Sequence, residues 1–245
     1  MVGRFPHIYS MATFKHSGHC GDILYSLPTV RALGGGMYYI NPGKITNMTN
    51  ILAESLAPLI QCQKYITGVQ IWHGQPIDYD LDKFREIRNL SHKNLADAHL
   101  VKFGHAVSER DKPWLYVNDP IECDILINRT KRYHGKIFDW RALIDTHKDR
   151  DIRFVGLKDE YTAFCKDFDV IIPFHPTKNF LELARLIAGS NIFCGNQSSP
   201  LATAIGLGVT AEVEVDPTTP NCRFCRPNIK YHYSYPPCPS GYRVV

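Results

Sequence analysis

The stretch His16-Ser17-Gly18-His19-Cys20-Gly21-Asp22-Ile23-Leu24-Tyr25-Ser26-Leu27-Pro28 decides the fold. It follows an apolar, strand-like run from Ile8 to Phe14 and leads into a helical pattern that ends at Gly34-Gly35-Gly36. A strand, a glycine-containing loop and a helix start form a β-α turn, and open parallel α/β sheets bind their ligands at such turns. The stretch therefore predicts an α/β fold with a ligand site at its first turn.

The turn itself carries residues suited to acid–base chemistry. Gly18 and Gly21 allow the backbone to turn tightly, and Asp22 lies where free N–H groups at a helix start keep a carboxylate ionised and oriented. Such a carboxylate could accept a proton from a substrate hydroxyl. His19, three residues earlier, is the second acid–base candidate. The alternative is that Asp22 only caps the helix, which is the common use of Asp at this place.

Composition indicates a soluble globular protein. The chain has 245 residues, of which 44% are hydrophobic and 21% charged, enough for one large domain or two ordinary ones. No apolar run approaches the roughly 20 residues that span a bilayer, and no secretory signal is recognisable, so we expect a cytoplasmic protein. Residues 218–245 contain four Arg or Lys and no acid. This favours anionic partners: nucleotides, phosphates or nucleic acid.

Strand-like and helix-like segments alternate through the first half of the chain. The pattern there predicts strands at 37–40 and 69–72, a helix with Met48, Ile51, Leu52, Leu56 and Leu59 on one face, and a charged helix at 82–90. The polar stretch 105–120, with Pro113 and Pro120, is the expected domain linker.

The second half repeats the alternation. The pattern there predicts strands at 124–128, 152–155, 170–172, 192–194 and 209–215, and helices at 140–147, 159–166 and 180–188, with a further helix that Ser199 caps and Gly208 stops. In the last strand, Glu212 and Glu214 alternate with apolar residues, which predicts one wetter face. Repeated β-α-β units imply parallel sheets with right-handed crossovers.

Two such halves predict two Rossmann-like, parallel-sheet α/β domains that face each other across a cleft. The expected boundaries are 1–119 for the first domain and 120–217 for the second. A basic tail rich in Cys, Tyr and Pro follows at 218–245.

A second candidate site follows the strand at 192–194. Gly195 is followed by Asn196, Gln197, Ser198 and Ser199, at the start of the next helix. Free N–H groups and hydroxyls at such a place suit a phosphate or diphosphate. The alternative is an ordinary capped helix.

The third candidate site is the loop from Asn128 to Lys136, which follows the first strand of the second half. Its cations include Arg129, Lys131 and Arg132. Beyond the carboxyl end of a strand they could neutralise a diphosphate, and the two arginines are favoured because they bind phosphate in a bidentate way. The alternative is a solvated basic loop.

The tail combines Cys222, Cys225, His232 and Cys238. These are ligand types of a structural zinc site, although the spacing is not that of a strong zinc-finger pattern. The alternative is a set of structural thiols. The aromatic residues between them could stack on bases or cover an apolar surface.

Two stretches resemble a known family. Gly21-Asp22-Ile23-Leu24-Tyr25-Ser26-Leu27-Pro28, followed by Arg31-Ala32-Leu33, resembles the opening of the ADP-heptose–lipopolysaccharide heptosyltransferases, which are GT-B glycosyltransferases. Leu181-Glu182-Leu183-Ala184-Arg185-Leu186-Ile187-Ala188, a strand and then Gly195-Asn196-Gln197-Ser198-Ser199-Pro200 are similar to that family's donor-binding helix and loop.

The resemblance implies a GT-B fold and transfer from a nucleotide-diphosphate sugar to an acceptor hydroxyl, without a required cofactor or metal. It implies that Asp22 is the general base. The loop residues Ser17, Gly18 and Gly21 would then lie on the acceptor side, and Ser198 and Ser199 would bind the donor.

The sequence also departs from the family pattern. Gln197 replaces the usual acid of the donor loop, Ala202 stands where many members have histidine, and the chain is shorter than a typical member. Heptose and lipopolysaccharide are therefore not carried over. Two alternatives stay open: a catalytically degenerate GT-B-like module that binds a nucleotide or sugar, and a nucleic-acid-modifying glycosyltransferase whose tail holds the polymer.

Overall fold

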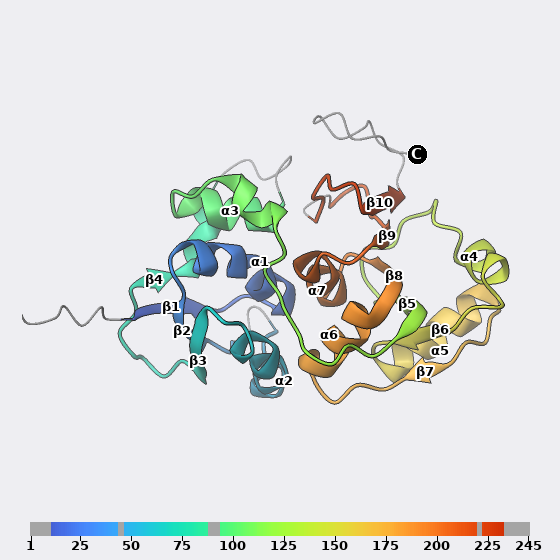
Figure 1. Ribbon diagram of the computed structural model, residues 1–245, viewed down its shortest axis with the longest axis horizontal. Helices are drawn as coiled ribbons and strands as arrows, with labels where there is room; N and C mark the ends of the chain where they lie inside the picture. Colours follow the sequence, from blue (N-terminus) through green and yellow to red (C-terminus); the bar gives the residue numbers. More distant parts are fainter. Residues whose placement is uncertain (1–10, 44–46, 88–93, 220–221, 233–245) are drawn as a thin grey trace, which may run out of the picture.

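The protein contains two parallel β-sheets, each with its own helices (Figure 1). The computed structural model describes residues 11–43, 47–87, 94–219 and 222–232. The four-stranded sheet has the order β3-β2-β1-β4, and its strands are β1 (Ala12–His16), β2 (Gly36–Ile40), β3 (Ile66–Ile71) and β4 (Tyr79–Asp80). Its helices are α1 (Cys20–Ala32), α2 (Asn50–Gln61), the 3-10 helix η2 (Leu81–Glu86), α3 (Leu95–Lys102) and the 3-10 helix η4 (Val107–Asp111).

The six-stranded sheet has the order β10-β9-β8-β5-β6-β7. Its strands are β5 (Cys123–Asn128), β6 (Ile152–Val155), β7 (Phe174–His175), β8 (Ser190–Asn196), β9 (Ala211–Glu214) and β10 (Ile229–His232). Its helices are α4 (Trp140–Thr146), α5 (Lys158–Phe168), α6 (Phe180–Gly189) and α7 (Ser199–Leu207). The pairs within both sheets are parallel. The predicted fold class, two parallel-sheet α/β domains, is therefore confirmed.

Helix α1 lies between the two domains, where it contacts α7 (Figure 1). Its residues are buried on most sides, Leu24 and Leu27 completely, because one face meets the first sheet and another meets the second domain. The same apolar core continues into α7 through Leu201 and Ile205. The two domains thus share one core, and the turn before α1 is fixed against the second domain.

The connection between the domains is also part of this core. Trp114 is fully buried, and its indole N–H donates to the backbone oxygen of Leu24 at 3.1 Å. Its backbone N–H donates to the oxygen of Gly206 at 2.8 Å. The stretch that the sequence predicts as a linker is therefore held between α1 and α7.

The three glycines after α1 allow the chain to enter β2 beside β1. Gly36 has φ +149°, and a Cβ atom there would lie 1.9 Å from the backbone oxygen of Ala12 on the paired strand. Only glycine allows this close approach.

Some predicted elements are wrong or shifted. No strand forms at 170–172. Val170 and Ile172 are buried in the second core, Ile171 is 94% exposed, and the strand starts only after Pro173, whose oxygen accepts from Phe154 N at 2.8 Å. A proline has no N–H for the ladder.

Helical predictions also need correction. Ile51 is 78% exposed, because α2 turns Ala53, Leu56, Leu59 and Ile60 inward instead. The charged segment at 82–90 forms a 3-10 helix at Leu81–Glu86, and 88–90 lie outside the described residues.

The first strand and three further elements also differ from the prediction. The first strand is Ala12–His16 rather than 8–14, and its expected start lies outside the described residues. The elements α3, β4 and β10 were not predicted. None of the helices in the described part of the chain has the length and apolarity that crossing a membrane requires.

Candidate active site between the two domains

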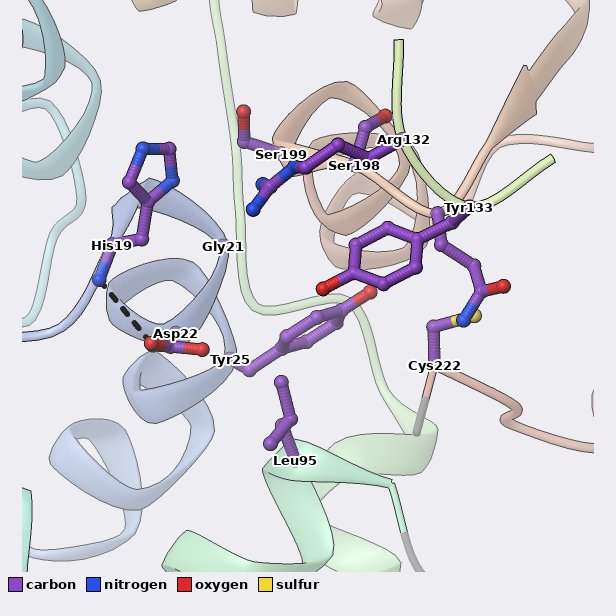
Figure 2. A pocket seen from close by; sticks show the side chains of 11 residues that line it. His19, Gly21, Asp22, Tyr25, Leu95, Arg132, Tyr133, Ser198, Ser199 and Cys222 are labelled. Carbon is purple, nitrogen blue, oxygen red and sulfur yellow. Dashed lines mark hydrogen bonds between the residues drawn. The ribbon is translucent and has the colours of Figure 1, made fainter. Parts of the chain in front are cut away.

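A cavity of about 170 Å³ lies between the loop before α1 and the loops that follow β5 and β8 (Figure 2). Its walls come from His19, Gly21, Asp22, Tyr25 and Leu95 in the first domain and from Arg132, Tyr133, Gln197, Ser198, Ser199 and Cys222 in the second. The structure thus brings together three loops that are far apart in the chain and that the sequence predicts to bind ligands.

Asp22 is the third residue of α1, and it faces this cavity. Its Oδ2 accepts from the backbone N–H of His19 at 3.2 Å, so His19 is the N-cap and Asp22 its reciprocal partner. Burial raises the pKa of Asp22, although the Arg85 guanidinium, 3.6 Å from Oδ2, and the His19 N–H both act to lower it. A carboxylate with a raised pKa is a better proton acceptor, which suits a general base.

Hydrogen bonds to the side chains of His16 and Asp82 hold the loop before α1. Ser17 N donates to Asp82 Oδ1 at 3.0 Å, and Gly18 N donates to His16 Nδ1 at 2.7 Å. A Cβ atom on Gly18 would lie 2.4 Å from His16 Cε1 and 2.8 Å from Asp22 Oδ2. Ser17 and Gly18 therefore do not line the cavity, but Gly18 allows the carboxylate to approach the loop.

A pair of buried histidines connects this loop to α3. His16 Nε2 lies 3.0 Å from His99 Nε2, and His99 Nδ1 lies 2.7 Å from the backbone oxygen of Leu95. A carbonyl only accepts, so His99 Nδ1 carries a proton. His16 Nδ1 accepts from Gly18, so its Nε2 carries one and donates to His99. Both rings are thus neutral, and burial lowers the pKa of both, that of His99 to about 3.

On the opposite wall, the N-terminus of α7 has no side-chain cap. Ser198 is the N-cap residue, where the sequence predicts Ser199, but its hydroxyl donates backwards, to Asn128 Oδ1 at 3.2 Å and to Asn196 O at 3.0 Å. The first N–H groups of α7 are therefore left without a capping side chain. Such groups bind anions, helped by the helix dipole.

Arg132 brings a positive charge to the same cavity. The residue is exposed, and its guanidinium lies 5.2 Å from the centroid of the Tyr133 ring. His19 and Arg132 line the same cavity, where burial lowers the pKa of His19 and the charge of Arg132 lowers it further. Asn196 holds this loop by accepting from Thr130 N at 2.9 Å and donating to the oxygen of Arg132 at 2.5 Å. Asn196 thus positions the loop and does not line the cavity.

Gln197 lines the cavity, but its amide is bound elsewhere. Its Oε1 accepts from Asp216 N at 2.7 Å, and its Nε2 donates to the oxygen of Thr219. The side chain therefore holds the segment that follows β9.

Two predicted donor-binding cations lie outside the cavity. Arg129 Nε donates to Glu214 Oε2 at 2.8 Å, and Lys131 Nζ pairs with Asp159 at 2.5 Å. Glu214, expected on a wetter face, is 1% exposed, and its carboxylate also accepts from the indole N–H of Trp140 at 3.3 Å. Arg129 thus balances a buried charge within the second domain.

The described members of the predicted zinc set, Cys222, Cys225 and His232, do not form a metal site together. Cys222 lines the cavity, where burial raises the pKa of its thiol to about 12. Cys225 is disulfide-bonded, and His232 donates to Glu212 at 2.8 Å. Cys238 lies outside the described residues, and among those described no group of three or more His, Cys, Asp or Glu is arranged to hold a metal ion.

The described part of the tail packs against the junction of the domains. Phe224 stacks on Tyr25 with ring centroids 5.4 Å apart, and Arg226 donates to the oxygen of Ile205 at 2.8 Å. Lys230 lies 3.7 Å from Glu212. At Phe224, the tail therefore covers an apolar surface. This is one of the two roles that the sequence allowed for the aromatic residues of the tail.

Sequence reasoning missed several residues of this site. Tyr25 lies three residues after Asp22 and so on the same side of α1, a spacing that could have indicated it. Arg85 and Leu95 are brought to the site by long-range packing, and no local pattern identifies them. Tyr133 lies in the predicted loop from Asn128 to Lys136, but the sequence reasoning singled out only the cations of that loop.

The fold is that of known glycosyltransferases. The structure is similar to ADP-heptose lps heptosyltransferase II of E. coli, with a TM-score of 0.60 and 10% identity over 91% of this chain and 90% of that one. It is also similar to a glycosyl transferase of family 9 from Veillonella parvula DSM 2008, with a TM-score of 0.58 and 12% identity over 84% and 80%.

A third similar structure is E. coli heptosyltransferase WaaC with ADP-2-deoxy-2-fluoro heptose, with a TM-score of 0.54 and 11% identity over 82% and 87%. The sequence itself matches no protein-family model and no curated protein. The comparisons thus establish a GT-B-like fold.

Proposed function

We propose that this protein is a glycosyltransferase that moves a sugar from a nucleotide-diphosphate sugar to an acceptor hydroxyl. One observation carries the proposal: the carboxylate of Asp22 and the uncapped N-terminus of α7 line the same cavity, together with Arg132. The first group can accept a proton, and the other two can bind a diphosphate. The glycosyltransferase fold of the similar structures supports the same conclusion.

The donor would bind mainly to the second domain. Its diphosphate would accept from the N–H groups at Ser198 and Ser199 and pair with the Arg132 guanidinium. The WaaC structure contains an ADP-sugar analogue, so ADP-sugars are the first donors to examine.

In the reaction, Asp22 would take the proton of the acceptor hydroxyl and become a carboxylic acid. The acceptor oxygen would form a bond to the anomeric carbon, while the bond from that carbon to the diphosphate oxygen breaks. The bonding electrons leave with the diphosphate, whose charge the α7 N–H groups and Arg132 are already placed to meet. We propose that these groups suffice without a metal ion. A single displacement of this kind inverts the anomeric carbon.

The role of Asp22 can be tested by separating binding from turnover. We expect Asp22→Asn to reduce transfer by about 100-fold or more, as the loss of a general base does, while calorimetry shows donor affinity within about twofold of the wild type. Asp149→Asn removes an exposed carboxylate of the second domain and serves as the control. Unchanged turnover in Asp22→Asn would exclude Asp22 as the base.

One observation favours a second function, a binding module without chemistry. Gln197 uses its amide to hold Asp216 and Thr219 instead of presenting an acid to the cavity. A module of this kind would bind a nucleotide sugar but neither transfer nor hydrolyse it. Product analysis of the wild type with bound donor and a panel of glycan acceptors distinguishes the two functions.

A further inference from the structure

The cavity wall beside Asp22 contains a buried hydroxyl without a partner. Tyr25 is 4% exposed, and its ring stacks on Phe224. Among the described residues, no group forms a hydrogen bond with its hydroxyl. Buried tyrosine hydroxyls nearly always have such a partner. Because Tyr25 lines the cavity, the partner of this hydroxyl can be a ligand that enters it.

The opposite wall presents a second tyrosine on a strained backbone. Tyr133 has φ +59°, a left-handed conformation that an aromatic residue rarely adopts. Asn196 holds the loop in place through the oxygens of Thr130 and Arg132. Strain that the surroundings impose in this way is typical of ligand sites. The Tyr133 ring points into the cavity, as the Tyr25 ring does from α1 (Figure 2).

We propose that Tyr25 and Tyr133 form the subsite for the sugar ring of the donor. This inference rests on the proposed glycosyltransferase function. With its diphosphate on α7 and its anomeric carbon facing Asp22, the donor must place its sugar ring between the two domains. The two tyrosines and Leu95 line the walls there, together with His19, Gly21, Gln197 and Cys222.

Each wall has a definite role in this subsite. The Tyr133 ring packs against the C–H face of the sugar, and Leu95 contributes a second apolar contact. The Tyr25 hydroxyl forms a hydrogen bond with one sugar hydroxyl. A sugar that lacks that hydroxyl leaves Tyr25 unpaired and binds less tightly, so Tyr25 determines specificity.

The test compares a nucleotide sugar with its own nucleoside diphosphate. A panel of ADP-, GDP- and UDP-linked hexoses and heptoses identifies the tightest donor, and calorimetry then gives its affinity and that of the free nucleoside diphosphate. The ratio of the two affinities reports the contacts to the sugar alone. We expect this ratio to fall about fivefold or more in Tyr25→Phe, as loss of one hydrogen bond predicts, with the affinity for the free nucleoside diphosphate unchanged.

A second variant examines the ring on the other wall. Tyr133→Asn removes the ring, and asparagine tolerates the left-handed backbone. We expect the same ratio to fall in this variant without loss of stability.

Thermal unfolding shows whether the Tyr25 hydroxyl has a partner within the protein. Tyr38 is a matched control, because it is fully buried and its hydroxyl lies 2.9 Å from Ser26 Oγ. Tyr38→Phe should lower the melting temperature and keep the affinity ratio. Tyr25→Phe should keep or raise the melting temperature.

The outcomes separate this inference from the function on which it rests. If the wild type binds no nucleoside diphosphate and no nucleotide sugar, the proposed function fails. If it binds both, but Tyr25→Phe keeps the wild-type ratio, the sugar subsite is wrong and the proposed function stands. If Tyr25→Phe destabilises the protein as Tyr38→Phe does, the hydroxyl is bound internally and the subsite is also wrong.

Discussion

The buried pair His16 and His99 should make the protein sensitive to mild acid. Each ring is neutral in the folded protein, and burial lowers the pKa of both; that of His99 falls from 6.5 to about 3. In the unfolded chain both rings bind protons at their ordinary pKa. The unfolded state therefore binds more protons below pH 6.5, and stability falls as the pH falls.

The magnitude follows from the shift at His99. Each pH unit between the two pKa values changes the free energy of unfolding by about 1.4 kcal/mol. Acidification from about pH 7.5 to about pH 4.5 should thus remove about 2.7 kcal/mol through His99 alone. The stability of a typical domain is roughly 5–15 kcal/mol, so a loss of this size is easily measured.

Charged groups near the pair act in other pH ranges or in the opposite direction. Asp82 lies 3.5 Å from His16, and its lowered pKa removes stability only as the pH falls below 3.8. Burial raises the pKa of Asp22, so the titration of this carboxyl increases the free energy of unfolding as the pH falls. Arg85 and Lys15 lower the pKa of His16 and keep their charge throughout.

Urea unfolding followed by tryptophan fluorescence measures this effect. In His99→Gln, the difference in unfolding free energy between about pH 7.5 and about pH 4.5 should be smaller than in the wild type by about 2.7 kcal/mol. His73 is exposed, so His73→Gln should keep the wild-type difference. If His99→Gln also keeps it, the two rings are not buried in the neutral form.

Three further predictions concern the loop, the buried ion pair and the thiol in the cavity. Gly18→Ala should reduce turnover by about 100-fold, since its Cβ would displace Asp22 by a fraction of an ångström or more, and circular dichroism should show a folded protein. Arg129→Met leaves the buried Glu214 without its cation, and chemical unfolding should show a loss of about 3–5 kcal/mol; a loss below 1 kcal/mol would contradict the assignment. Cys222, whose pKa burial raises to about 12, should resist iodoacetamide in the folded protein and react in urea, as peptide mapping can show.

Local patterns in the sequence predicted the elements that depend on their own residues. The strand Ile152–Val155 is apolar except for Arg153 and is followed by a glycine, and the structure has the same bounds. The helix expected at 180–188 forms at Phe180–Gly189. Both elements can be predicted from their local composition and from the residues that end them, so no tertiary information is needed.

Elements that depend on distant partners were missed. Helix α3 buries Asp97 and His99, which a local reading places on a solvated surface. Asp97 pairs with Arg110 at 2.8 Å, and His99 pairs with His16, 83 residues away. These contacts allow the two polar side chains to be buried together with the apolar residues Ala96, Ala98 and Leu100 of the same helix.

In the candidate site, too, features that depend on local sequence were predicted and features that depend on distant partners were not. The turns with Asp22 and Ser198 were found because glycine, an acid and a helix start lie together in the sequence. Arg129 was assigned to the donor, but its partner Glu214 is 85 residues away, so charge pattern alone could not separate it from Arg132.

The central claim is that the cavity between Asp22 and α7 binds a nucleotide-diphosphate sugar. Its most direct test is calorimetric titration of the panel of ADP-, GDP- and UDP-linked sugars into the wild type, Arg132→Ala and Lys131→Ala. Lys131 is the matched control, because it pairs with Asp159 at the surface and does not line the cavity. We predict that one class of nucleotide sugar binds the wild type and Lys131→Ala equally, and Arg132→Ala about tenfold more weakly. Equal affinity in all three proteins, or no binding to the wild type, would contradict this account.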